Sequence, residues 1–146
     1  MFNYLKSKIL FLSLLFATTS IVYSDVVEKN YSIKYNRYLE WITLSFKIKA
    51  YNINNNYVYF YADDLKIGMF SGKDAEINNN GDIIIEYKEE SFTKAELIKF
   101  YAKCKKGDIK NINFYNNSFD SKPAVSIPIS QFPNFVNNFI KEFDKL

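Results

Sequence analysis

The chain offers few residue types for acid–base or metal chemistry. Its 146 residues include no histidine and one cysteine, Cys104. Histidine is the commonest general base and the commonest metal ligand in proteins, and a single cysteine cannot form an internal disulfide. We therefore expect no catalytic residues, no metal site and no cofactor. The sequence leaves open whether Cys104 is buried or forms an intermolecular disulfide.

Carboxylates are the remaining groups that could catalyse a reaction. Two pairs stand out, Asp63-Asp64 and Glu89-Glu90. Adjacent residues of a strand point to opposite faces, so neither pair is expected to converge on one substrate bond. The segment 76–87 resembles part of a calcium-binding loop, but it begins with Glu76 and closes on Tyr87. A hairpin turn at Asn80-Gly81 is the favoured interpretation.

Tyrosines recur at alternate positions in the segment 57–61, with apolar residues between them. The segment 42–50 alternates in the same way, with lysines on its polar face. If the two segments pair as a hairpin through Asn54–Asn56, tyrosines and lysines share one open face of the sheet. The predicted contact surface consists of Tyr57, Tyr59, Tyr61, Lys47 and Lys49. Such a surface suits a protein or a glycan, whereas the alternative is a tyrosine ladder that only stabilises the sheet.

The N-terminus has the pattern of a cleavable secretory signal peptide. Two lysines lie within Met1–Lys8, and the apolar run Ile9–Ala17 follows. This run is too short to cross a bilayer, which needs ~20 apolar residues. A small-x-small motif predicts cleavage between Ser24 and Asp25, and a second motif would allow cleavage after Ser20.

We therefore expect residues 1–24 to be a signal peptide and residues 25–146 to be one exported domain, in the periplasm or outside the cell. No second long apolar run follows, so we expect no membrane span after the leader is removed. Two of the 19 basic residues lie in the leader and all 16 acids lie outside it, so the mature chain is nearly neutral. A nearly neutral domain lacks the basic surface that nucleic-acid binding requires.

Periodicity predicts seven strands and two helices. The strands are expected near 31–35, 42–50, 57–61, 65–69, 82–88, 109–115 and 124–129, and Asp25–Asn30 is expected to be a loose leader. Thr93 and Glu96 form a capping box that starts a helix, and Gly107 ends it. Ser130 is expected to cap the second helix.

The predicted fold class is α+β. It has a mainly antiparallel sheet of about six to seven strands, with helices at about 93–105 and 130–145 packed on one face. The strand and helix after Ala124 resemble the end of PUR-type single-strand nucleic-acid-binding domains. That resemblance implies nucleic-acid binding, which the predicted export and the near-zero charge argue against.

Three functional hypotheses follow. The first is an exported, non-catalytic binding or interaction protein whose partner is a protein or a glycan. The second is a small secreted enzyme that acts on glycan or cell-wall material through carboxylates. The third is nucleic-acid binding, which ranks last. The sequence leaves the oligomeric state open.

Overall fold

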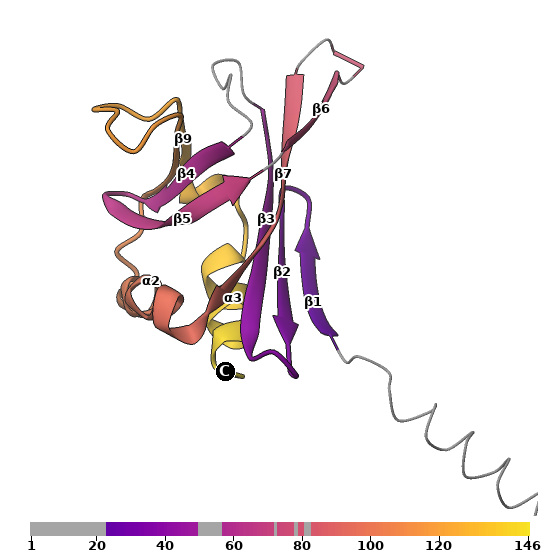
Figure 1. The fold of residues 1–146 in the computed structure, drawn as a ribbon, viewed down its shortest axis with the longest axis vertical. Coiled ribbons are helices and arrows are strands. Elements are labelled where there is room, and N and C mark those ends of the chain that lie inside the picture. Colours follow the sequence, from indigo (N-terminus) through magenta and orange to yellow (C-terminus); the bar gives the residue numbers. More distant parts are fainter. Residues whose placement is uncertain (1–22, 50–56, 72, 78, 81–82) are drawn as a thin grey trace, which may run out of the picture.

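The computed structural model describes residues 23–49, 57–71, 73–77, 79–80 and 83–146. Within those ranges the chain forms nine strands and two α-helices, so the predicted α+β class is confirmed. The strands divide into two antiparallel sheets. Sheet B and both helices cover the same side of sheet A (Figure 1).

Sheet A contains five strands. In spatial order they are β1 (Tyr23–Glu28), β2 (Tyr31–Asn36), β3 (Trp41–Lys49), β7 (Ile83–Thr93) and β6 (Lys73–Ile77). Sheet B contains four, in the order β5 (Leu65–Ser71), β4 (Tyr57–Ala62), β8 (Asn111–Tyr115) and β9 (Val125–Pro128). The helices are α2 (Lys94–Lys106) and α3 (Phe135–Phe143).

The core lies where these layers meet, and Phe46 of β3 is at its centre. Its ring centroid is 5.0 Å from that of Phe60 and 5.7 Å from that of Phe114, both in sheet B. It is also 5.5 Å from the ring centroid of Phe135 in α3. Burial of these large rings is the main stabilising contribution, because apolar area removed from water is worth roughly 25 cal/mol per Å².

The expected hairpin between the segments 42–50 and 57–61 is wrong. β3 pairs with β2 and β7, whereas β4 pairs with β5 and β8. Alternation fixes which face of a strand is buried but does not name its neighbour. Here the two apolar faces meet face to face, as Phe46 and Phe60 do, and not side by side. The predicted turn at Asn54–Asn56 lies outside the described residues.

Gly68 allows the two sheets to approach each other where β5 meets β7. A Cβ atom at this position would clash with Cε1 of Phe92.

The second predicted hairpin, with its turn at Asn80-Gly81, is found in sheet A: β6 pairs with β7, with Ile77 opposite Ile83. Parts of its turn lie outside the described residues.

The expectation of a loose leader at Asp25–Asn30 is also wrong. These residues contribute to β1, which pairs with β2 so that Val26 lies opposite Ile33. Ser24, Val26 and Glu28 are partly buried, and Asp25 and Val27 are exposed. The strand therefore follows period two, and Val26 packs against the core.

Helix α2 begins and ends as predicted. The Thr93 side chain accepts from the Glu96 backbone N–H, Glu96 accepts from the Thr93 N–H at 2.7 Å, and Gly107 ends the helix at φ 72°. The predicted stripe is buried at Leu97, Phe100 and Cys104.

Helix α3 starts later than predicted. Ser130 lies in a short 3₁₀ turn (Ile129–Gln131) and does not cap α3, whose N-cap is Asn134. Proline disfavours helical dihedrals in the residue before it, and Phe132 accordingly has φ −113° and ψ 73°. Pro133 therefore separates the 3₁₀ turn from α3, where the sequence had suggested one continuous helix over about 130–145.

Candidate functional site

The outer face of sheet B carries the three predicted tyrosines. Tyr57, Tyr59 and Tyr61 alternate with residues whose side chains are fully buried. The rings of Tyr57 and Tyr59 meet edge to face, with centroids 6.3 Å apart. The Nζ atom of Lys66 lies 4.4 Å from the centroid of the Tyr59 ring, a cation–π contact.

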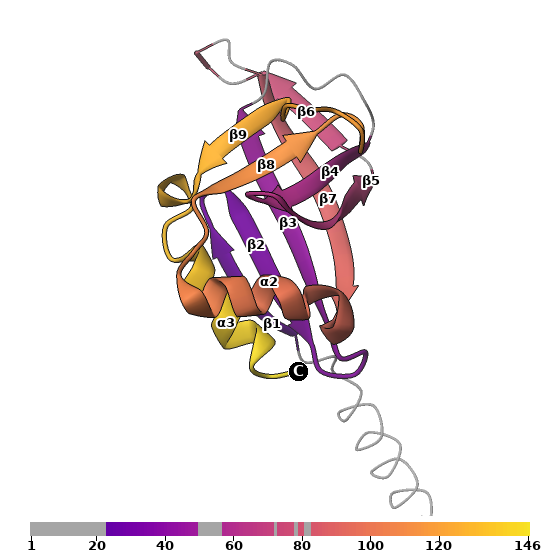
Figure 2. The ribbon, with the colours of Figure 1, turned by 90° about the vertical axis from the view of Figure 1, so that its left-hand side faces the viewer.

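Neighbouring strands extend this aromatic surface. Tyr59 lies opposite Met69 of β5 on one side and opposite Tyr115 of β8 on the other. The Tyr115 ring packs against Tyr61, with centroids 4.7 Å apart. We call the set the tyrosine face: Tyr57, Tyr59, Tyr61, Tyr115 and Met69. Figure 2 shows sheet B from this side, and no helix or strand of the described chain lies in front of it.

The sequence analysis did not single out one exposed aromatic residue in the loop that follows β8. Phe119 lies in the β8–β9 loop, which begins next to Tyr115, and 96% of its surface is exposed. Asn117 and Asp120 close a turn around it, because the Asn117 N–H donates to the Asp120 carboxylate at 3.0 Å. The signal in the sequence was a lone phenylalanine between turn-forming residues.

Lys47 and Lys49 do not share the tyrosine face. Both lie on β3 of sheet A and alternate with the core residues Phe46 and Ile48. Because Phe46 points toward sheet B, Lys47 and Lys49 belong to the opposite, outer face of sheet A. The structure therefore separates the five side chains predicted as one contact surface into two groups.

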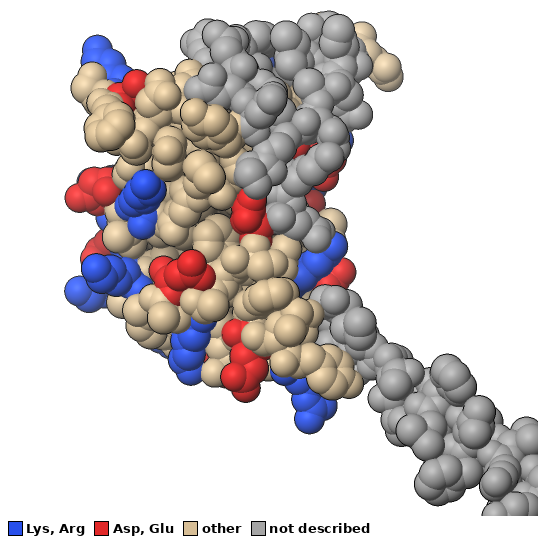
Figure 3. All heavy atoms as spheres, viewed as in Figure 1, with Lys and Arg blue, Asp and Glu red and all other residues tan. Residues whose placement is uncertain are grey.

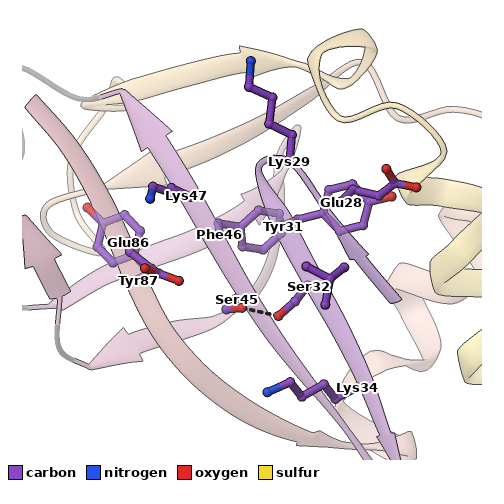
Figure 4. A pocket seen from close by; sticks show the side chains of 11 residues that line it. Glu28, Lys29, Tyr31, Ser32, Lys34, Ser45, Phe46, Lys47, Glu86 and Tyr87 are labelled. Carbon is purple, nitrogen blue, oxygen red and sulfur yellow. Dashed lines mark hydrogen bonds between the residues drawn. The ribbon is translucent and has the colours of Figure 1, made fainter. Parts of the chain in front are cut away.

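The outer face of sheet A is built from small hydroxyl side chains. We call Ser32, Thr43, Ser45 and Ser91 the hydroxyl face. Ser32 is hydrogen bonded to Ser45, and the Thr43 and Ser91 hydroxyls lie 3.0 Å apart. A hollow of about 670 Å³ opens beside Ser32 and Ser45, with Lys34, Lys47 and Glu86 among its lining (Figure 4).

The acid pair Asp63-Asp64 links the β4–β5 turn to α2 and β8. The Asp63 carboxylate accepts the backbone N–H of Asn111 at 2.8 Å and lies 3.2 Å from the Lys103 ammonium. Burial alone would raise the pKa of Asp63, but these donors outweigh it and hold the pKa below its usual value. Lys103 also hydrogen bonds to Asp64 at 3.1 Å and lowers its pKa. The pair therefore ties α2 to the β4–β5 turn and to β8.

Three further carboxylates are those of Glu142, Glu89 and Glu90. Glu142 is 1% exposed and lies 2.6 Å from the Lys145 ammonium. Glu90 lies in β7, while the Glu89 side chain is outside the described residues. In the described ranges no three carboxylate or cysteine side chains gather in a way that could hold a metal ion.

Cys104 is buried in α2, and burial raises the pKa of its thiol to about 12. A thiol with this pKa is almost fully protonated at neutral pH. Because thiol–disulfide exchange proceeds through the thiolate, Cys104 is poorly suited to an intermolecular disulfide in the folded domain.

The predicted cleavage position lies within regular structure. Ser24 and Asp25 are part of β1, opposite Tyr35 and Lys34. The Ser24 hydroxyl accepts from Lys145 Nζ at 2.7 Å, so the start of β1 is tied to the C-terminal end of the chain. Cleavage after Ser24 would remove the first two residues of β1, whereas cleavage after Ser20 would leave the strand whole.

Neither sign of charge dominates the described surface on the side of the molecule seen in Figure 3. Basic and acidic side chains are interspersed on the face shown in Figure 3. No helix in the described ranges has the length and apolar character to cross a membrane. Comparison of the chain with protein-family models, curated proteins and solved structures found no match.

Proposed function

We propose that this chain is an exported, non-catalytic binding protein that captures a protein partner through its tyrosine face. The observation that carries the proposal is the concentration of aromatic side chains on the outer face of sheet B. Removing large apolar groups from water lowers the free energy, so a surface on which they are concentrated is suited to binding a partner.

The composition of this surface favours a protein partner over a glycan. Tyrosine, phenylalanine and methionine are enriched at protein interfaces. Met69 and Tyr57 are 42% and 43% exposed, and Phe119 in the loop that follows β8 is 96% exposed. Complete burial of a phenylalanine side chain contributes about 1.5–3 kcal/mol.

Export is supported by the order of features at the N-terminus. Lysines precede the apolar run Ile9–Ala17, and small residues suited to cleavage follow it. Cell fractionation followed by mass spectrometry of the N-terminus tests this part. A chain that begins at Asp25 or at Ile21 in the periplasm or culture fluid supports export. A chain with an intact Met1 in the cytosol contradicts it.

The binding experiment has two stages. The partner is first identified by cross-linking to the wild-type protein in the native compartment and is then purified. Affinity for the wild-type protein is next compared with that for Tyr57→Ser and Phe119→Ser. Each substitution is expected to weaken binding by roughly tenfold, because exposed aromatic residues dominate interface energies.

Ile98→Ser is the matched control. Ile98 is 44% exposed, as Tyr57 is, but it lies on α2 and away from the tyrosine face. Binding that is insensitive to both aromatic substitutions, or equally sensitive to the control, contradicts the proposal. Displacement of the partner by a soluble glycan would show that the surface recognises sugar instead.

A further inference from the structure

The turn between β2 and β3 presents two large apolar side chains to solvent. Tyr38 is 61% exposed and Leu39 is 54% exposed, and neither belongs to the buried core or packs against it. Turns are usually built from small or polar residues, which suit the backbone angles of a turn or hydrogen bond to its backbone. Single exposed apolar residues are common on protein surfaces, but an adjacent pair at the tip of a turn indicates a contact site.

Hydrogen bonds to one buried side chain fix the shape of this turn. Asn36 is the last residue of β2, and its side-chain oxygen accepts the backbone N–H of Tyr38 at 2.9 Å and that of Leu39 at 3.1 Å. Glu40 has φ 50°, in the left-handed region, where the chain turns back into β3. Because the turn is already ordered, contact with a partner costs little conformational entropy.

The turn lies at the end of the molecule where the N-terminal segment joins the fold. Tyr23, the first residue of β1, is opposite Asn36 at the base of the turn. In Figures 1 and 2 the β2–β3 turn, the start of β1 and the C-terminus are together at the lower end. Residues 18–22 separate Tyr23 from the apolar run Ile9–Ala17, and a chain of this length spans at most about 20 Å. A bilayer that held this run would therefore lie within reach of the turn.

We propose that Tyr38 and Leu39 form a membrane-contact tip that enters the interfacial region of a lipid bilayer. Tyrosine is enriched where membranes meet water, because its ring is apolar and its hydroxyl stays hydrated. Leu39 adds apolar area, on which interfacial binding depends. Arg37 and Glu40 are exposed on either side of the pair and carry opposite charges. Apolar contact and not charge therefore drives the binding.

The membrane-contact tip is distinct from the tyrosine face. The tip belongs to sheet A, whereas the tyrosine face lies on sheet B. The β2–β3 turn is at the lower end of the view in Figure 2 and sheet B is in its upper half, so a bilayer at the tip leaves the tyrosine face open to a protein partner. Either proposal can therefore fail without the other.

The single tryptophan of the chain is a reporter for this tip. Trp41 lies two residues after Leu39 and opposite Asn36. A chain of residues 21–146, which keeps β1 whole, is mixed with millimolar lipid as vesicles of phosphatidylcholine, with and without phosphatidylglycerol. Co-sedimentation measures binding, and lipids brominated on their acyl chains quench the fluorescence of a tryptophan close to them. We expect binding to both kinds of vesicle, with quenching of Trp41, because the contact is apolar.

Two variants locate the contact. Tyr38→Ser/Leu39→Ser is expected to weaken vesicle binding by at least about tenfold, because it removes the apolar side chains and keeps the backbone of the turn. Val27→Ser/Ile98→Ser is the matched control, since Val27 and Ile98 are exposed apolar residues of β1 and α2, away from the turn. The control should bind vesicles as the wild type does. Circular dichroism checks that both variants are folded.

Three results would each overturn the proposal. The first is a wild-type chain that binds neither kind of vesicle, or binds only those with phosphatidylglycerol and is released by salt. The second is bound protein whose Trp41 fluorescence is not quenched, a measurement that does not depend on any variant. The third is an equal loss of binding in the control variant.

Discussion

The outer faces of sheet A and sheet B carry different kinds of side chain. On sheet B, large rings project outward and pack edge to face, as Tyr57 and Tyr59 do. On sheet A, small hydroxyls are bonded to one another, as Ser32 is to Ser45. Hydroxyls of the hydroxyl face are paired with one another beside a hollow, whereas the tyrosine face leaves aromatic side chains partly exposed to solvent. Side-chain size, and not strand geometry, sets this difference.

Of the substitutions that test this comparison, one in the core between the two sheets is expected to have the largest effect. Phe46→Ala is expected to lower the free energy of unfolding by about 3–5 kcal/mol, because it empties space between Phe60, Phe114 and Phe135. Tyr57→Ser on the outer face should change it by less than about 0.5 kcal/mol. Urea denaturation measures both values. A similar loss in the two variants would mean that the tyrosine face is structural.

A tyrosine that faces inward gives the second test. Tyr87 is fully buried and stacks on Phe114, with centroids 5.5 Å apart. Its hydroxyl has no hydrogen-bond partner in the described part of the chain, and burial raises the pKa of the group. Tyr87→Phe is expected to raise the free energy of unfolding by about 1 kcal/mol, since it removes an unsatisfied buried polar atom.

Thermal unfolding followed by circular dichroism measures this gain, and Tyr59→Phe on the outer face is the matched control. The control should be nearly neutral because its hydroxyl lies on a partly exposed ring. A destabilised Tyr87→Phe variant would show that the buried hydroxyl has a partner after all.

The sequence predicted the faces of the strands better than their neighbours. Alternation correctly placed Val58 and Phe60 inside and Tyr59 outside, and the capping residues Thr93 and Gly107 defined α2. The division into two sheets could not be predicted, because period two says nothing about which strand lies beside which. The separation of Lys47 from the tyrosines follows from that division.

Two further features depended on local chemistry that periodicity does not describe. Pro133 breaks the amphipathic pattern before α3 because it restricts the residue that precedes it. Phe119 is exposed by a turn, and a lone aromatic residue in a loop leaves no periodic signal. Thus the sequence correctly predicted that the tyrosines of β4 share an outer face, but it gave no periodic sign that Phe119 is exposed in the loop after β8.

Substitution of serines on the hydroxyl face tests whether their hydroxyl groups stabilise the protein by hydrogen bonding to one another. Ser32→Ala leaves the Ser45 hydroxyl without the partner it has in the wild type, and the free energy of unfolding should fall by about 1 kcal/mol. Ser32→Ala/Ser45→Ala removes both groups and should be less destabilising than the sum of the two single variants. A double-mutant cycle from urea denaturation gives the coupling. Additive effects would show that the two hydroxyls act independently.

The smallest expected effect is on the pH dependence of the free energy of unfolding, through the contacts of Asp63 that link sheet B to α2. The pKa of Asp63 is lower in the folded protein than its usual value of 3.8, because donors from Asn111, Lys103 and Lys110 favour the carboxylate. A lowered folded pKa stabilises the protein above the unfolded pKa, and this stabilisation is lost as the pH falls through the folded value.

We therefore expect the free energy of unfolding to decline below about pH 4 more steeply in the wild type than in Asp63→Asn, which has no proton to take up at this position. Urea denaturation at pH 6, 4 and 3 measures the two slopes. If the slope of Asp63→Asn matched that of the wild type, the contacts of Asp63 with Lys103 and Asn111 would not contribute to stability, and sheet B would be held to α2 by apolar packing alone.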